Sequence, residues 1–307
     1  MPKIQINSVI NQRYRVDSFI YVGNPVAYKV LDLTKQTYIE MKVLNLDFLD
    51  DPRAVKLFIR EANAYKKFSH PNIVPFYGFE KTDDAVLMLQ KFIDGGTVRE
   101  LLKTKRPLPI NDVLVIMKAL CASLGYAHRF GVVHCDVKPG NILFDQGGAI
   151  YLTVLDIARY AFSTATIFNN AGTVAYMSPE QIRGNVVTSA TDIYSLGITL
   201  FELLTGQRPF TGTPKNNQQK SGASNDEQIR NEHLNSIPPN PSAINNAINP
   251  QIAQVILRAL EKKPEDRFQT TDELFHALCV ACQVDKNNIP DRISLELLPN
   301  KTNTAAP

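Results

Sequence analysis

The chain has 307 residues, a length that allows one two-lobed domain or two small domains. Hydrophobic residues make up 44% and charged residues 21%, which is ordinary for a globular protein and excludes wholesale disorder. The net charge of +3 is too small to favour binding to nucleic acid or to a membrane surface, so we expect no nucleic-acid partner.

No apolar stretch near the N-terminus is long enough for a signal peptide, and no run approaches the roughly 18 apolar residues of a membrane span. The four cysteines (Cys121, Cys135, Cys279 and Cys282) are then typical of a protein in a reducing cytoplasm, which is the location we expect. Cys279 and Cys282 form a C-x-x-C pair inside a helical pattern, with no second pair for zinc. This favours helix packing over a metal site.

Apolar runs that alternate with turn residues predict strands within residues 13–45, and helical spacing of apolar residues predicts a helix over 52–68. Further strands are predicted over 73–79, 85–93, 141–144 and 150–154, the last two joined by the turn sequence DQGG. From residue 97 onward helices dominate, over 97–104, 110–130, 190–206, 250–261 and 271–282.

Strands first and helices later indicate an α+β fold with two lobes of different character. We expect one domain over residues 13–285, with an N-lobe of about 13–93 and a C-lobe of about 97–285, joined at Asp94-Gly95-Gly96. Two segments are polar by composition: about 211–227, predicted to be a surface insertion, and 286–307, predicted to be a flexible tail.

The run from His134 to Asn141 reads HCDVKPGN and gathers three useful groups on one tight loop. Phosphoryl transfer needs a carboxylate for the hydroxyl proton, a lysine near the transferring phosphate and an amide oxygen for a metal ion. Asp136, Lys138 and Asn141 supply these groups. The run resembles the catalytic loop of protein kinases, and all five specified letters of the pattern HxDxKPxN match.

Other segments resemble the same family in the same order. Lys42 stands where kinases have the strand lysine that holds the α- and β-phosphates, and Glu61 matches the glutamate that pairs with it. Residues 172–180, GTVAYMSPE, resemble the end of the activation segment of Ser/Thr kinases, in which Thr173 is the threonine that contacts the catalytic aspartate and lysine. That stretch builds a peptide-docking surface, which argues against a small-molecule kinase of related fold.

Structural positions of the family also match. Asp192 and Gly197 resemble the buried helix that anchors the catalytic loop, and Arg267 resembles the arginine that pairs with the residue corresponding to Glu180. The resemblance covers about residues 13–282, and the sequences of these motifs are most similar to those of bacterial Hanks-type Ser/Thr kinases. It implies a bilobal kinase fold with an antiparallel N-lobe sheet, one regulatory helix and a mainly helical C-lobe. It implies ATP and Mg²⁺ as cofactors if the chain is active, and it leaves a homodimer open.

The metal-binding aspartate of the family is missing from its usual place. In kinases it follows the loop asparagine after twelve residues, and the same count from Asn141 reaches Val154. Val154-Leu155-Asp156 thus stands in place of Asp-Phe-Gly, and valine offers no oxygen to Mg²⁺. Asp156 comes two positions later, about 6–7 Å further along an extended chain. It remains, with Asn141, the alternative metal ligand.

The loop that covers the nucleotide phosphates is altered as well. Ile20, Val22 and Pro25 stand at the three glycine positions that let the backbone approach phosphates without a Cβ clash. Gly23 remains, out of register, as a candidate for nucleotide contact. Pro25 also removes a backbone N–H that could have met a phosphate.

Further departures concern the adenine pocket and the loop. Glu40 replaces the alanine of the pocket roof, where a buried charge costs several kcal/mol unless it is paired, for example with a lysine. Gln90 replaces the apolar gatekeeper. Lys91 and Phe92 occupy the hinge, whose contacts with adenine are made by the backbone. Cys135 replaces the arginine that docks a phosphorylated activation loop.

Two hypotheses follow. The first is a regulatory or scaffolding pseudokinase that binds a protein partner, with weak or no Mg-ATP binding. The second is an active Ser/Thr kinase that transfers the γ-phosphate to protein hydroxyls with an atypical metal site. In that case Lys42 positions the phosphates, Asp136 orients the hydroxyl and Lys138 stabilises the transferring group.

Overall fold

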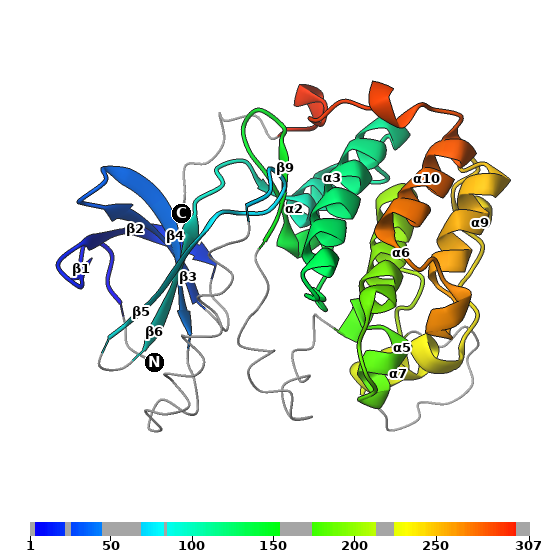
Figure 1. Ribbon diagram of the computed structural model, residues 1–307, viewed down its shortest axis with the longest axis horizontal. Coiled ribbons are helices and arrows are strands. Elements are labelled where there is room, and N and C mark those ends of the chain that lie inside the picture. The colour runs from blue at the N-terminus through cyan, green and yellow to red at the C-terminus, as the bar shows by residue number, and fades with distance from the viewer. Residues whose placement is uncertain are drawn as a thin grey trace. The chain divides into compact units, whose positions relative to one another are not determined.

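The computed structural model describes residues 4–21, 26–44, 69–82, 85–153, 174–212 and 224–298. The chain divides into two units, which are described separately: an N-terminal unit up to Asp94 and a C-terminal unit from Gly95 onward (Figure 1). The helix predicted over residues 52–68 lies outside the described residues.

The N-terminal unit is a six-stranded antiparallel sheet with the order β1-β2-β3-β4-β6-β5. Its strands are β1 (Val9–Ile10), β2 (Tyr14–Tyr21), β3 (Val26–Asp32), β4 (Thr37–Leu44), β5 (Phe76–Lys81) and β6 (Val86–Lys91). Alternate residues of these strands, including Val16, Val30 and Met41, are fully buried on one face. The predicted N-lobe sheet is thus confirmed, and the alternation follows from the two-residue period of a strand.

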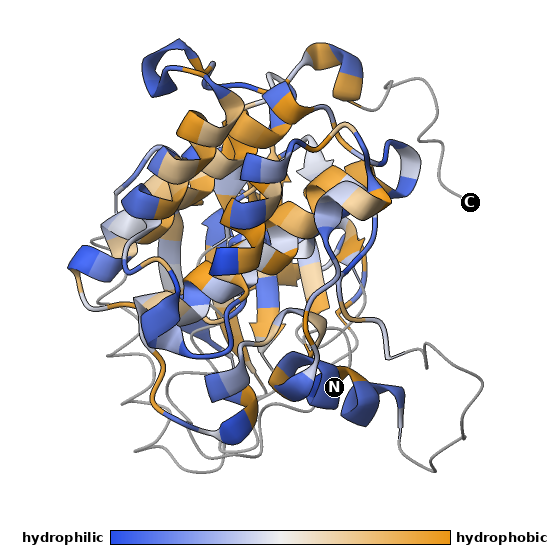
Figure 2. Ribbon diagram, turned by 90° about the vertical axis from the view of Figure 1, so that its right-hand side faces the viewer, coloured by the Kyte–Doolittle hydropathy of each residue, from blue (hydrophilic) through white to orange (hydrophobic). Residues whose placement is uncertain are grey.

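The C-terminal unit is mainly helical. Its helices are α2 (Val98–Thr104), α3 (Ile110–Arg129), α5 (Pro179–Arg183), α6 (Ser189–Thr205), α7 (Asn225–Asn235), α8 (Pro241–Ile244), α9 (Pro250–Ala259) and α10 (Thr271–Cys282). A small sheet joins β7 (Gly96–Thr97), β8 (Ile142–Phe144) and β9 (Ile150–Leu152) in that order. Hydrophobic and hydrophilic positions alternate along the helices, as burying one side of each requires (Figure 2).

Helix α6 is the centre of this unit and is buried over nearly its whole length. Gly197 allows the neighbouring helix α9 to approach closely, because a Cβ at this position would lie 2.9 Å from the Cβ of Ala259. The helix ends at Gly206, whose φ of 75° is the left-handed conformation that terminates many helices. Helices α3, α9 and α10 pack around it (Figure 1).

Helix α3 has the length and composition of a membrane span, with a mean hydropathy of 1.4 in its most apolar window. In this structure 61% of that window is buried inside the protein, where it packs against α6 and α10. A core helix of a water-soluble domain meets the same criteria, so this helix is weak evidence for a membrane segment.

A buried ion pair joins helix α5 to the loop before α10. Arg267 is 1% exposed and donates from both terminal nitrogens to the Glu180 carboxylate, at 2.8 and 2.9 Å. The remaining guanidinium hydrogens meet the carbonyl oxygens of Ala190, Glu261 and Lys262. Burial alone would raise the pKa of Glu180, but the hydrogen bonds and charge of Arg267 outweigh it and hold the pKa below its usual value.

The segment from residue 286 is packed, which corrects the prediction of a flexible tail for its described part, 286–298. Ile289, Ile293 and Leu297 are each at most 6% exposed and join the core of the C-terminal unit. The Ile293 amide donates to the carbonyl of Gly148 at 2.9 Å, in the turn between β8 and β9. The segment is polar by composition, but three apolar residues spaced four apart pack it against the core.

The predicted insertion, 211–227, is partly helical. Residues 213–223 lie outside the described residues, but Ser224 and Glu227 form a capping box with amide-to-oxygen distances of 2.8 and 3.3 Å. These bonds satisfy amides at a helix N-terminus that otherwise lack partners. Helix α7 therefore begins within the segment predicted to be an insertion.

Removing the Arg267 side chain tests the buried ion pair. We expect Arg267→Met to lower the free energy of unfolding by about 3–5 kcal/mol, because the variant leaves the Glu180 carboxylate buried and unpaired. The control, Arg258→Met, removes an exposed arginine that stacks on Phe268 and should cost about 1 kcal/mol or less. Urea denaturation measures both; an equal loss in the two variants would contradict this account.

The same pair predicts how stability depends on pH. Because the pKa of Glu180 is lower in the folded state than the ordinary value of 4.5, the pair stabilises the protein fully above that value. Its contribution is lost as the pH falls through the folded-state pKa. Wild-type protein should therefore lose more stability than Arg267→Met on acidification below about pH 4.5, measured by urea denaturation at each pH. Parallel pH profiles would contradict the assignment.

The packing of residues 286–298 is tested by two neighbouring truncations. Ile293→Ala should lower the free energy of unfolding by about 2–5 kcal/mol, since Ile293 is 2% exposed in the core. Leu295→Ala should change it by less than about 0.5 kcal/mol, because Leu295 is 68% exposed. If the two variants have the same stability, the segment does not pack in solution as described here.

Candidate active site

The loop from His134 to Asn141 lies between α3 and β8, and one buried carboxylate fixes its path. Asp192, on α6, is fully buried and accepts hydrogen bonds from the amides of His134 and Cys135 at 2.8 and 2.7 Å. Its third partner is His128 on α3, whose Nε2 lies 2.7 Å from Asp192 Oδ2. The predicted anchoring role of Asp192 is visible in these contacts.

Cys135 takes an unusual backbone conformation, with φ of 63°. Few residues other than glycine adopt this left-handed conformation, and such strain persists where the surroundings impose it. Here the Cys135 amide is held by Asp192 and its carbonyl accepts a hydrogen bond from Gln181 Nε2 at 2.9 Å. Both backbone polar groups of Cys135 are therefore held by side chains of other helices, Asp192 of α6 and Gln181 of α5.

Gln181 is a residue that the sequence analysis did not single out. It also forms a capping box with Ser178 at the start of α5, so one side chain links the helix terminus to the catalytic loop. The S-x-x-Q spacing is a recognisable helix-start pattern and could have indicated the cap, although not the bond to Cys135.

The three predicted catalytic groups lie together. Lys138 Nζ is 2.7 Å from Asp136 Oδ2 and 2.9 Å from Oδ1, and Asn141 Nδ2 donates to Asp136 Oδ2 at 2.8 Å. Asn141 Nδ2 also donates to the Asp136 carbonyl at 2.7 Å. The structure thus brings together a carboxylate, an ammonium group and an amide, with both carboxylate oxygens already hydrogen-bonded.

His134 connects this loop to the strand that follows the hairpin. Its Nδ1 accepts from the Asp136 amide at 3.2 Å, so its Nε2 is left to donate to the Thr153 carbonyl at 3.2 Å. This arrangement uses the neutral imidazole. It fixes the position of Thr153, the last described residue before residue 154.

The hairpin of β8 and β9 has a regular register. Ile142 pairs with Leu152, Leu143 with Tyr151, and Phe144 with Ile150. The Thr153 amide then donates to the Asn141 carbonyl at 2.9 Å, which continues the register by one more pair. No residue bulges out of this hairpin between Asn141 and Phe144 or between Ile150 and Thr153.

Several predicted site residues lie outside the described residues. These are Gly23, Glu61, Val154, Asp156 and Thr173.

In the N-terminal unit, Lys42 and Glu40 lie on the same face of β4. Lys42 Nζ is 3.6 Å from Glu40 Oε1, and both side chains are largely buried, 14% and 8% exposed. A lysine partner is one of the ways in which a buried Glu40 can keep its charge, and Lys42 is that partner. Lys42 has further interactions, so this contact is one of several.

Gln90 lies opposite Glu40 in the pairing of β6 with β4. It is completely buried, and neither atom of its amide finds a hydrogen-bond partner in the described part of the chain. An unpaired buried amide costs about 1–3 kcal/mol. Next to it, the Lys91 amide donates to the Pro75 carbonyl at 2.8 Å, and the Phe92 ring lies 5.3 Å from Lys29 Nζ.

A second polar contact lies behind the segment predicted to dock peptides. The Tyr176 hydroxyl donates to Glu202 Oε2 at 2.5 Å. Burial raises the pKa of Glu202 above its usual range, and the hydrogen bond from Tyr176 lowers it only in part. Nothing in the sequence analysis predicts this pair, because Glu202 lies in the helical run of α6 with no motif of its own.

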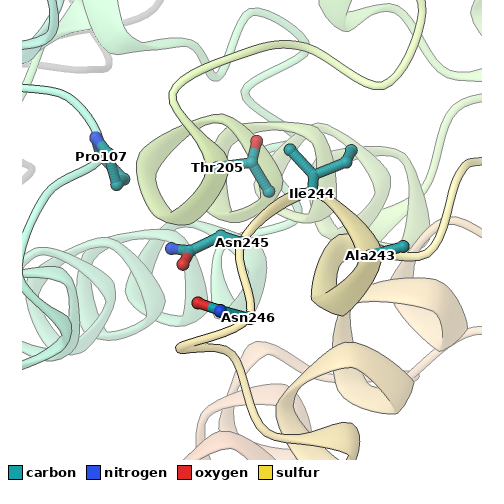
Figure 3. A pocket seen from close by; sticks show the side chains of 6 residues that line it. All are labelled: Pro107, Thr205, Ala243, Ile244, Asn245 and Asn246. Atoms are coloured by element: carbon teal, nitrogen blue, oxygen red, sulfur yellow. The ribbon is translucent and has the colours of Figure 1, made fainter.

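A hollow of about 400 Å³ lies elsewhere in the C-terminal unit, between α6 and α8 (Figure 3). Its lining is Pro107, Thr205, Ala243, Ile244, Asn245 and Asn246. None of these side chains is titratable, and Asn245 is engaged with the carbonyl of Leu204 and the amide of Ala247. The hollow therefore offers no catalytic group.

Among the described residues there is no cluster of three or more His, Cys, Asp or Glu side chains that could hold a metal ion. Cys279 and Cys282 both lie in α10 as free thiols, and burial raises the pKa of each. Cys279 lies in the hydrophobic core of the unit, and Cys282 packs against that core.

Comparison with known proteins agrees with this arrangement. The family model described as "Protein kinase domain" matches residues 23–279. Serine/threonine-protein kinase PrkC of Bacillus subtilis is 33% identical over 92% of this chain, and PknB of Mycobacterium tuberculosis is 32% identical over 87%. The chain spans 42% of the length of each of these two relatives.

The fold is also found in solved structures. The PknI kinase domain of Mycobacterium tuberculosis superposes with a TM-score of 0.70 at 22% identity, covering 92% of this chain and all of that domain. At that identity the likeness concerns the fold alone. Together with the match over residues 23–279, these findings show that the chain belongs to the protein kinase domain family and is related to bacterial Hanks-type Ser/Thr kinases.

Proposed function

We propose that this Ser/Thr protein-kinase domain is a pseudokinase: a domain that binds a protein partner and has weak or no Mg-ATP binding. The observation that carries the proposal is the register of the β8–β9 hairpin, in which Thr153 pairs with Asn141. The residue after Thr153 is Val154, at the position where kinases have the metal-binding aspartate.

Asp156 could replace the missing aspartate only if the hairpin absorbed two additional residues. The pairing from Ile142 to Leu152 is one to one, so the described strands contain no such residues. Asp156 follows Thr153 by three positions, two more than the family requires, which corresponds to about 6–7 Å in an extended chain. Mg²⁺ demands near-ideal geometry and does not tolerate a displacement of that size.

The described residues do not fit a magnesium ion. Both carboxylate oxygens of Asp136 already accept hydrogen bonds, from Lys138 and Asn141. The amide nitrogen of Asn141 is also engaged, so the loop offers the Asn141 amide oxygen as its one neutral ligand atom. Mg²⁺ is usually bound through one or two carboxylates plus substrate phosphates.

The N-terminal unit supports the same proposal. Lys42 is the residue that would attract the nucleotide phosphates, and a neighbouring carboxylate, that of Glu40, lies 3.6 Å from its ammonium group. A phosphate would have to compete with this largely buried anion and would be repelled by it. Gln90 adds a buried amide beside Glu40 that finds no hydrogen-bond partner among the described residues, which makes this face of the sheet polar where the family has apolar side chains.

The groups that hold the C-terminal unit in shape are intact. Asp192 anchors the catalytic loop, and Arg267 pairs with Glu180 in the interior. The substitutions concentrate on phosphate and metal, whereas the largely buried segment 174–183 keeps its helix cap and its packing. An intact C-terminal unit with a defective nucleotide site is the pattern expected of a protein-binding scaffold.

An active kinase is the second candidate, and the geometry of the catalytic loop favours it. Lys138 Nζ lies 2.7 Å from Asp136 Oδ2. In this position Asp136 can orient a hydroxyl, and Lys138 can stabilise a transferring phosphoryl group. In this alternative Asn141 and Asp156 would share one metal ion. The relatives named as kinases belong to longer proteins, so their activities are a guide for this chain and no more.

Thermal denaturation with ATP tests the two candidates. We expect the melting temperature with ATP plus Mg²⁺ to equal that with ATP plus a chelator, because the residue after Thr153 is Val154, which offers no oxygen ligand. A ligand at 100 times its dissociation constant would stabilise the protein by about 2.7 kcal/mol, which such an assay detects readily. Val154→Asp restores a carboxylate at the missing position and serves as the positive control for a metal-dependent shift.

Phosphate incorporation into the protein itself and into a generic basic protein is measured in parallel. The proposal predicts the same background incorporation for wild-type protein and for Asp136→Ala. A metal-dependent melting shift, together with incorporation that Asp136→Ala abolishes, would establish the active kinase instead.

A substitution at Glu40 tests the N-terminal unit. Glu40→Ala should raise the affinity for ATP without metal by about tenfold, which corresponds to about 1.4 kcal/mol, because it removes the anion beside Lys42. Glu40→Gln should give a similar gain if charge is the obstacle, and none if the obstacle is side-chain volume. The gain should disappear in Glu40→Ala/Lys42→Met. Isothermal titration calorimetry measures all four proteins, and an unchanged affinity in Glu40→Ala would refute the role given to Glu40.

A further inference from the structure

Three arginines of the C-terminal unit surround the contact between Tyr176 and Glu202. Arg208, Arg99 and Arg106 each lower the pKa of Glu202 through their positive charge, against the larger effect of burial. Arg208 and Arg99 act on Tyr176 in the same direction. Two of them also lie near the same end of α6: Arg106 packs against Gly206, whose amide donates to the Glu202 carbonyl at 2.8 Å, and Arg208 follows Gly206 by two residues.

Two of the arginines are placed by packing against glycines. The Arg99 guanidinium lies over Gly140 of the catalytic loop, where an added Cβ would be 3.2 Å from Nε and 3.3 Å from Cζ. The side chain of Arg106 crosses Gly206 at the end of α6, with its Cβ 3.3 Å from the position of an added Cβ. The first arginine thus borders the catalytic loop, and the second lies beside the end of α6.

The three guanidinium groups have no partner in the part of the chain that the structure describes. Among the described residues, none of Arg99, Arg106 and Arg208 donates a hydrogen bond or forms an ion pair at contact distance, although Glu202 is near. Arg99 and Arg106 are exposed and Arg208 is half-buried. Each guanidinium carries five N–H donors in a planar fork that suits carboxylates and phosphates. These donors are therefore available to another molecule.

The balance of charge decides which molecule suits them. A lone carboxylate such as Glu202 would attract a basic side chain, but here it is half-buried, bonded to Tyr176 and outnumbered by three positive charges. Lys138, two residues before Gly140, is paired with the Asp136 carboxylate at 2.7 Å and so adds no net charge here. The three arginines outweigh the one carboxylate of Glu202, although the chain as a whole has a net charge of only +3.

We propose that the face defined by Arg99, Arg106 and Arg208 binds an acidic segment of a protein partner, with successive Asp or Glu side chains meeting separate arginines. This proposal rests on the proposed function in one respect, that the domain binds a protein. Several carboxylates suit the face better than one phosphate does, because Arg99 and Arg106 are anchored at two different glycines. Arginine pairs with carboxylates through two parallel hydrogen bonds, so each contact adds specificity as well as affinity.

The proposal is tested by fluorescence anisotropy with short labelled peptides and the full chain, without nucleotide. The probes are a glutamate-rich peptide, its glutamine counterpart, a lysine counterpart and a glutamine peptide that carries one phosphoserine. We expect the glutamate-rich peptide to bind at least about tenfold more tightly than the glutamine and lysine peptides at low salt. Its affinity should fall as the salt concentration rises, because exposed charges are screened.

Charge reversal locates the binding face. Arg99→Glu/Arg106→Glu should weaken binding of the glutamate-rich peptide by roughly tenfold or more. The control, Lys103→Glu/Arg129→Glu, makes the same change in net charge at exposed positions on α2 and α3 that do not surround Glu202. It should weaken binding by less than about threefold. Unchanged melting temperatures verify that both variants are folded.

Each other outcome overturns the proposal. Equal loss in the two double variants would indicate attraction by net charge alone. Tighter binding of the lysine peptide would show that Glu202 dominates, and tighter binding of the phosphoserine peptide would make the face a phosphate site. Equal binding of the acidic and glutamine peptides would leave the face without an acidic partner. None of these results depends on nucleotide binding, so the pseudokinase proposal is judged separately by its metal and ATP measurements.

Discussion

The arrangement of the C-terminal unit depends on one buried carboxylate. Asp192 has no exposure to solvent, and three donors surround it: two successive amides of the catalytic loop and the imidazole of His128. A buried carboxylate is tolerated only when such donors replace its lost hydration. This requirement forces Cys135 into its left-handed conformation and presents Asp136 to its partners, whether or not the domain transfers phosphate.

The hydrogen bonds that shape the catalytic loop are therefore separate from the groups that would bind phosphate and metal. The bonds that shape the loop run to Asp192, Gln181 and Thr153, none of which needs a nucleotide or a metal ion. The departures from the family pattern fall at positions that serve phosphate and magnesium in kinases: Ile20, Val22 and Pro25 at the three glycine positions, and Val154 at the aspartate position. A domain can lose the residues that serve phosphate and metal and still keep the hydrogen bonds that shape the loop. The loss of a metal ligand at the edge of the interior costs the folded state no free energy.

Much of the fold could be predicted from the sequence, because strand alternation and helical spacing are local signals. Asp136, Lys138 and Asn141 lie within one short run, so their proximity followed from the sequence. Long-range packing could not be predicted in this way: the burial of Ile293 depends on Gly148, far away in the chain. The arginines around Glu202 likewise come from α2 and from two loops, and no spacing in the sequence joins them.

The central claim of the proposal is that Val154, the residue after Thr153, replaces the metal-binding aspartate of the family, and electron paramagnetic resonance of Mn²⁺ tests it most directly. Mn²⁺ is titrated with ATP in the presence and absence of the protein. The account predicts identical spectra, in which Mn²⁺ is bound by water and nucleotide alone. A protein-dependent signal that is lost in Asp156→Asn would contradict it, since that carboxylate would then be a metal ligand in spite of its position in the chain.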